Sequence, residues 1–155
     1  MNIGAFDRAM QRLDYIENEG RLSKEGIAQA ALLRAEIAIA AGHPESAVEL
    51  VDEASDVPDL ENAAAEILGK ALIRLTRYAE AADSLAVAEL GYEELEDKLR
   101  AANLKYLARG LDAHAKGDFA TAKADWAQIR DIKLRRAIEE HGVSLAAVDS
   151  RELRR

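Results

Sequence analysis

The chain contains no cysteine, only two prolines and nine glycines, and few aromatic residues. Without cysteine it cannot form disulfides or bind a metal through thiolates, which fits a reducing cytoplasm. So few prolines and glycines predict short loops between longer regular elements. The first residues lack a basic segment followed by an apolar core, and no apolar run approaches the length of a membrane span. We therefore expect a cytoplasmic protein without a signal peptide and without a membrane partner.

What the chain does contain is alanine and leucine: 49% of its 155 residues are apolar, but only 5% are aromatic. This composition favours closely packed helices over sheets, because the β-branched and aromatic residues that strands prefer are scarce. The length suits one domain with its own core. We expect a single all-α domain that spans residues 1–155.

The charged residues are unevenly distributed around a net charge of −8. Residues 44–68 include many acids and no lysine or arginine, whereas the segment from Arg130 onward is rich in lysine and arginine. We interpret the first as a solvated acidic face and the second as a solubilising tail. The alternative is a basic tail that binds an acidic partner or the acidic face of a second copy. The net charge argues against nonspecific binding of nucleic acid by the whole molecule.

Apolar spacing and capping residues predict seven or eight helices and no strands. Ser23 and Gly42 bound the second helix, Pro44 suits the first turn of the third, and Asp59 and Thr76 can cap the fourth and fifth. The expected helices cover about 3–16, 23–41, 44–57, 59–75, 76–91, 93–116 and 119–130. The last of these either stops near position 130 or continues to 140, and a short further helix is expected from position 144.

One turn sequence recurs three times. The aligned segments are Gly42-His43-Pro44-Glu45-Ser46-Ala47, Thr76-Arg77-Tyr78-Ala79-Glu80-Ala81 and Gly117-Asp118-Phe119-Ala120-Thr121-Ala122. Ala47 and Ala81 lie 34 positions apart, and Ala81 and Ala122 lie 41 positions apart. The seven extra residues in the second interval equal about two helical turns, so they lengthen the sixth helix and keep its inward face in phase.

This 34-residue helix–turn–helix period, with small and aromatic residues at set positions, resembles the tetratricopeptide repeat (TPR) family. The matching residues are Ala35, Ala47, Ala54 and Pro58 in the first repeat, Leu68, Gly69, Tyr78, Ala81 and Ala88 in the second, and Tyr106, Gly110, Ala122 and Trp126 in the third. The chain departs from the pattern at Arg34 and Arg109, where leucine is usual, at Ala31 and Ala65, where an aromatic is usual, and at Ile129, where alanine is usual.

The resemblance implies a right-handed α–α superhelix, a TPR-like solenoid of antiparallel helical hairpins. In this arrangement residues 1–20 form an N-terminal capping helix, 23–130 form three repeats, and 131–155 form a C-terminal capping helix with a basic tail. Gly69, Ala81 and Ala88 are then the small residues at which two helices approach closely. An apolar stripe of Leu134, Ala137 and Ile138 is expected to cover the last repeat.

In this family the first helices of successive repeats line a concave groove that holds a partner. The positions carried over to this chain are Leu32, Glu36, Ile39, Glu66, Lys70, Ile73, Arg74, Leu104, Leu107, Leu111 and His114. Glu66, Lys70 and Arg74 lie four residues apart on one helix face, which indicates a run of intrahelical ion pairs. Alternatively, the two cations anchor an acidic group of a peptide, with the leucines beside them as apolar anchors. The lysine and asparagine pattern with which some family members clamp a chaperone's C-terminus is missing.

The sequence lacks the signatures of catalysis and of metal binding. His43, His114 and His141 lie far apart and lack the spacing of metal ligands. Gly69 and Gly110 fall within helices and form no phosphate-binding loop, and the serines lack a nucleophile-elbow context. We expect a protein that is not an enzyme and uses no cofactor and no metal.

Three functions remain open. The first is a non-enzymatic interaction module or adaptor that holds a peptide or helix of a partner protein in the groove. The second is a structural protein that self-associates as a homo-oligomer by burying its apolar groove or cap surface. The third, which we rank lowest, is a nucleic-acid-linked regulator that uses the basic tail; its binding would weaken steeply with salt.

Overall fold

The computed structural model describes residues 3–18 and 23–141, with side chains at 8–15 and 23–140. Within these ranges it contains eight helices and no strand, which confirms the all-α prediction. The helices are α1 (Ile3–Asn18), α2 (Lys24–Ala41), α3 (Pro44–Ser55), α4 (Glu61–Arg74), α5 (Tyr78–Gly91), α6 (Leu95–Ala115), α7 (Phe119–Ala127) and α8 (Ile132–His141). In this part of the chain, no helix combines the length and the apolar character needed to cross a membrane.

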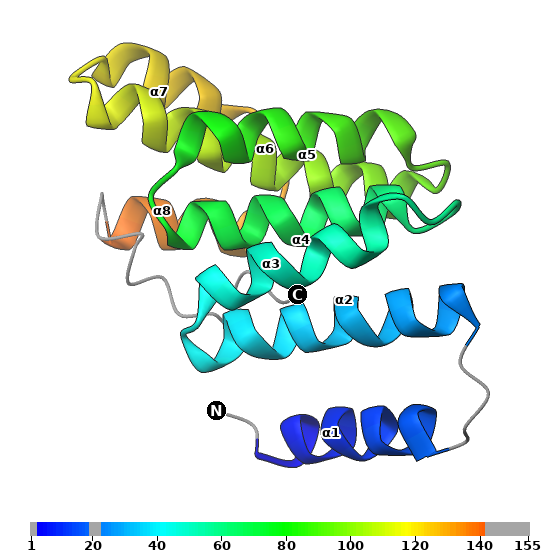
Figure 1. Ribbon diagram of the computed structural model, residues 1–155. Coiled ribbons are helices and arrows are strands. Elements are labelled where there is room, and N and C mark those ends of the chain that lie inside the picture. The colour runs from blue at the N-terminus through cyan, green and yellow to red at the C-terminus, as the bar shows by residue number, and fades with distance from the viewer. Residues whose placement is uncertain (1–2, 19–22, 142–155) are drawn as a thin grey trace.

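Neighbouring helices along the chain lie side by side from α1 to α8, and α4 also contacts both α2 and α6. Figure 1 shows the helices rising from α1 at the bottom, through α2 to α5, to α7 at the top, while α8 returns to the level of α4. The even-numbered helices α2, α4 and α6 therefore form one contiguous series, and α4 is its centre.

The turns after α2, α4 and α6 share one backbone geometry. Each begins with a residue in the left-handed conformation, with φ of 85° at Gly42, 59° at Thr76 and 80° at Gly117. The next N–H then donates to the carbonyl five residues back: His43 to Ala38 at 2.8 Å, Arg77 to Leu72 at 2.9 Å and Asp118 to Ala113 at 2.9 Å. This pattern is the Schellman motif, which satisfies carbonyls at the end of a helix. The three aligned turn sequences therefore do fold alike.

The predicted helix starts at Asp59 and Thr76 are wrong because both residues adopt the left-handed backbone conformation. Thr76 does not cap α5: it takes the left-handed turn position, and α5 begins two residues later at Tyr78. Asp59 also has a positive φ, of 69°, and α4 begins at Glu61 after Leu60. An N-cap needs an extended backbone, which neither residue has. By contrast, Ser23 caps α2 as predicted, because its Oγ accepts a hydrogen bond from the Gly26 N–H at 3.1 Å.

The C-terminal helices agree with the first predicted alternative, in which the seventh helix stops near position 130, and not with one helix that continues to 140. Helix α7 ends at Ala127, and a separate helix α8 begins at Ile132. Asp131 starts α8, since its Oδ1 accepts hydrogen bonds from the backbone N–H groups of Lys133 at 2.8 Å and Leu134 at 3.1 Å. The helix expected from position 144 and the basic tail lie outside the described residues.

The core consists of two clusters that meet at α4: one is built by α2, α3 and α4, the other by α4 to α8. Small residues allow the close helix contacts, as the sequence predicts. A Cβ atom at Gly69 would overlap the Leu85 side chain, and one at Gly110 would overlap the Trp126 ring. Ala81 and Ala88 are likewise fully buried. These contacts fix how closely α4 approaches α5 and α6 approaches α7.

Candidate partner-binding surface

The residues carried over from the family's groove lie on α2, α4 and α6, the helices that contact one another in series. They do not form one exposed strip. Glu36 is exposed, and Ile39, Lys70, Arg74 and His114 are partly exposed. The other members are buried, namely Leu32, Glu66, Ile73, Leu104, Leu107 and Leu111. The surface is therefore smaller and more polar than the sequence indicates.

The apolar end of the expected groove is covered by α8. Leu104, Leu107 and Leu111 of α6 belong to the same buried cluster as the α8 residues Leu134, Ala137 and Ile138. The predicted capping stripe is thus buried, and the three leucines face the interior of the molecule in this conformation. The same cluster also contains Leu72 and Ile73 of α4 and Leu85 of α5, so helices on several sides bury these leucines.

The charged middle is organised around a buried carboxylate. Glu66 on α4 is only 3% exposed, and its two oxygens accept hydrogen bonds from Arg100 on α6: Nε to Oε1 at 2.6 Å and Nη2 to Oε2 at 2.9 Å. The Tyr92 hydroxyl donates to Oε2 at 2.5 Å. Arg100 also donates to Asp97 at 2.7 Å. A buried charge is tolerated only when paired and hydrogen-bonded, and this one is both.

These contacts shift the acidity of the network. Burial alone would raise the pKa of Glu66, but hydrogen bonds from Arg100 and Tyr92 and the charge of Lys70 outweigh it, so this pKa is lowered from 4.5. Burial and the hydrogen bond to Glu66 raise the pKa of Tyr92. The hydrogen bond to Glu66 also raises the pKa of Arg100. At neutral pH the cluster therefore holds an ionised glutamate, a cationic arginine and a neutral tyrosine.

Lys70 is neutralised within the chain. Its Nζ lies 3.8 Å from Oε1 of Glu66, the intrahelical pair that the sequence predicts, and 4.0 Å from Oε1 of Glu36 on α2. Its side chain is only 17% exposed. Lys70 thus links α2 and α4. Two carboxylates of this chain already pair with the cation that the sequence analysis assigns to partner binding.

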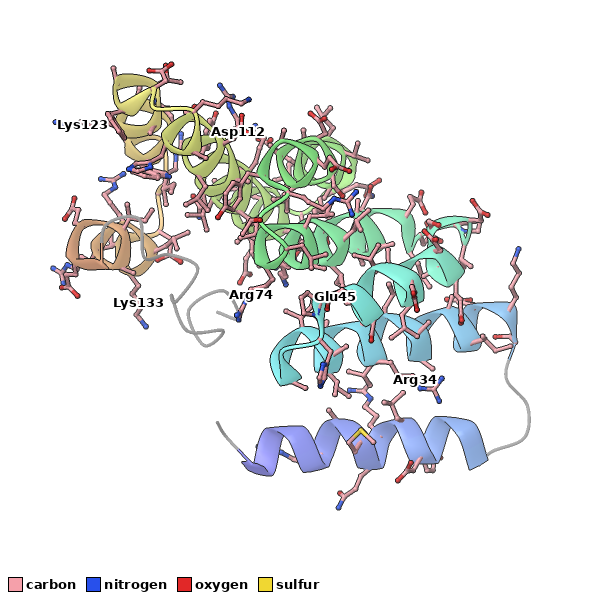
Figure 2. The ribbon with its side chains drawn as sticks, turned by 60° about the vertical axis from the view of Figure 1, so that its left-hand side comes forward. Arg34, Glu45, Arg74, Asp112, Lys123 and Lys133 are labelled. Carbon is pink, nitrogen blue, oxygen red and sulfur yellow. The ribbon has the colours of Figure 1, made fainter. Side chains whose placement is uncertain are left out.

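Arg74 differs from Lys70, although it lies only one turn further along α4. Its Nε is buried and has no hydrogen-bond partner, and no ion pair joins it to another residue in the described part of the chain. Figure 2 shows the Arg74 side chain pointing out of α4, on the side that lies between α8 and α2. A buried guanidinium N–H without an acceptor is unfavourable, by about 1–3 kcal/mol for a typical unsatisfied group. Arg74 is therefore the one residue of the expected set with a buried donor atom that the described residues leave without an acceptor.

The remaining members have structural contacts. Leu32 belongs to the cluster of α2 to α4, and Ile39 packs against it. Ile73 belongs to the other cluster. The His114 ring meets Phe119 edge-on, with centroids 4.8 Å apart, and stacks on Trp126 with centroids 6.1 Å apart. His114 thus contributes to an aromatic group at the α6–α7 turn.

Sequence reasoning missed Tyr92 and Arg100, the two hydrogen-bond donors to Glu66. The signal was present, because Glu66 and Arg100 lie 34 positions apart. Glu36 and Lys70 are separated by the same 34 positions. Residues one repeat apart occupy equivalent places on neighbouring helices, so opposite charges at that spacing predict an ion pair between helices. The same interval connects α2 to α4 and α4 to α6.

The described residues contain no group of three or more histidine or acidic side chains that could hold a metal ion. Comparisons of the chain with models of protein families, with curated proteins and with solved structures found no match.

Proposed function

We propose that this protein is a non-enzymatic interaction module built as a TPR-like right-handed superhelix. In this proposal α2, α4 and α6 line the concave face, which holds a peptide or helix of a partner protein. Three observations support the architecture: the contacts of α4 with α2 and α6, the shared geometry of the three turns, and the two ion pairs that span 34 residues.

The observation that carries the function is the unsatisfied Arg74 guanidinium. Its Nε is buried on the face expected to bind, and the described residues supply no acceptor for it. When the partly exposed Arg74 side chain turns outward, a carboxylate of a partner would satisfy this donor through the charge-assisted, bidentate contact for which arginine is suited. The leucines of α6 are not part of the proposed contact, because they are buried. The contact surface is instead the exposed part of α2 and α4 around Glu36 and Arg74.

The test replaces Glu36 with a photo-crosslinking amino acid and, as a control, replaces Lys123 in the same way. Both positions are exposed, and Figure 2 shows Lys123 on α7, far from Arg74. In the source cells we expect the Glu36 probe to crosslink to a defined protein and the Lys123 probe not to. Arg74→Glu should abolish this crosslink, whereas Lys123→Glu, a matched charge reversal, should leave it intact. A crosslink that survives Arg74→Glu would contradict the proposal.

Self-association remains a second candidate because one corner of the molecule exposes several apolar side chains. Val87 and Leu90 near the end of α5 and Leu95 at the start of α6 are 58%, 84% and 69% exposed. Sedimentation velocity over a concentration series tests this directly. Self-association through this corner predicts a rising sedimentation coefficient that Leu90→Glu removes. A constant monomer value would exclude it.

A further inference from the structure

A second concave feature lies outside the expected groove, between α1 and α2. This cleft has a volume of about 370 Å³ and is lined by Arg8, Ala9, Arg12, Gln29 and Leu33. Small-ligand and side-chain sites in proteins span roughly 300–1,000 Å³, so the space suffices for a few side chains of a bound segment.

The cleft carries a concentrated positive charge on a chain whose net charge is −8. Arg8 and Arg12 lie four positions apart on α1, which places both guanidinium groups on one face. Both residues are exposed, and no ion pair joins either one to another described residue. In contrast, Lys70, Arg100 and Lys105 are all paired with carboxylates of this chain. The two arginines are therefore free to bind an external anion.

The walls of the cleft favour a particular kind of anion. Ala9 and Leu33 supply apolar surface beside the two arginines, and the Gln29 amide donates to Glu25 at 3.4 Å, which leaves its carbonyl oxygen for a peptide N–H. A small inorganic anion would leave the apolar walls in water. A glutamate or aspartate next to an apolar side chain would pair with the arginines and cover Ala9 and Leu33 at the same time.

We propose that the cleft between α1 and α2 binds an acidic segment of a partner protein through Arg8 and Arg12. The partner supplies two carboxylates about one helical turn apart, which match the arginine spacing, and an apolar residue between them. This site is separate from the Arg74 surface, and it stands or fails independently of the function proposed above.

The probe is a synthetic 12-residue peptide, acetylated and amidated, with two glutamates four positions apart and a leucine between them. The matched control peptide has both glutamates changed to glutamine. With the ¹⁵N-labelled full chain, we expect the acidic peptide to shift NMR signals of α1 around 8–12 and of α2 around 29–33. Arg8→Gln with Arg12→Gln should weaken this binding at least tenfold, whereas Lys123→Gln, which removes an exposed cation on α7, should not change it.

A lysine double variant separates the contribution of charge from that of the arginine geometry. Arg8→Lys with Arg12→Lys retains both charges but loses the bidentate fork, so an intermediate loss of two- to fivefold is expected. Circular dichroism confirms that each variant keeps its helices, and glutamine and lysine are good helix formers. Absence of shifts at millimolar acidic peptide would overturn the proposal. So would equal binding of the glutamine peptide, or equal shifts with inorganic phosphate, or the same shifts produced by raising the protein concentration alone.

Discussion

The two halves of the expected groove differ in solvent exposure, although they occupy equivalent faces of neighbouring helices. The apolar half, Leu104, Leu107 and Leu111 on α6, is buried in a cluster to which α8 contributes Leu134, Ala137 and Ile138. The charged half, around Glu36, Lys70 and Arg74, remains at least partly exposed. The difference shows that similar helix faces become core or surface according to which other helices pack against them. Four predictions test this contrast, in order of decreasing effect.

The largest effect is expected from Leu107→Asp, which places a charge in the apolar half. Leu107 is 2% exposed, so the aspartate would be buried without a partner. We expect a loss of about 4 kcal/mol or more in the free energy of unfolding, enough to unfold much of the protein. Urea denaturation followed by circular dichroism measures it. Leu90→Asp, at 84% exposed, is the control and should change stability by less than about 0.5 kcal/mol. Equal effects of the two would show that Leu107 is not in the core.

The second effect concerns the charged half. Glu66→Gln removes the carboxylate shared by Arg100, Lys70 and Tyr92, and should cost about 2 kcal/mol at pH 7. This is less than for a fully buried pair, because Arg100 is partly exposed and can be rehydrated.

The effect of Glu66→Gln should depend on pH in a set direction. The pKa of Glu66 is lowered from 4.5 in the folded state, so its carboxylate contributes stability above that value. This contribution is lost as the pH falls from 4.5 through the lowered folded pKa. Urea denaturation of both proteins at pH 7 and pH 3 should therefore give a stability difference that shrinks at pH 3. A difference that is the same at both pH values would contradict the ion-pair account.

The third prediction concerns the stability of α8, which contributes side chains to the cluster that buries the α6 leucines. Asp131→Ala removes the acceptor for the first N–H groups of α8 and should destabilise it by about 1 kcal/mol. Hydrogen exchange measured by mass spectrometry should show faster exchange in α8 and unchanged exchange in α2. Asp131→Asn, which retains an acceptor oxygen, should restore most of the protection.

The smallest effect is expected from Glu36→Gln. Its ion pair with Lys70 spans 4.0 Å, and the Glu36 side chain is 51% exposed. Exposed pairs of this kind contribute about 0–0.5 kcal/mol, so thermal unfolding should change little. A loss above about 1.5 kcal/mol would mean that α2 and α4 depend on this pair far more than its geometry indicates.

Local sequence determined a large part of this fold. Ser23, Gly42 and Pro44 bound helices where their capping chemistry requires, and Gly69 and Gly110 stand where a Cβ would collide with a neighbouring helix. These features depend on one residue and its immediate neighbours, so they can be read without knowing the tertiary structure. The predicted N-caps at Asp59 and Thr76 are wrong because residue types that suit an N-cap also tolerate the left-handed turn conformation. Only the path of the chain selects between these two conformations.

The tertiary structure decided what the expected site contains. Glu66 becomes a buried acceptor only because Arg100 and Tyr92 arrive from α6 and from the turn before it. Lys70 is paired because Glu36 lies across from it on α2, whereas the described residues offer no acceptor to the Arg74 Nε, although its sequence context is similar. The leucines of α6 are core because they share one buried cluster with residues of α4, α5 and α8. Sequence alone specifies which residues share a helix face, since this follows from a period of 3.6 residues. Whether that face meets water, a charge or another helix depends on segments far away along the chain.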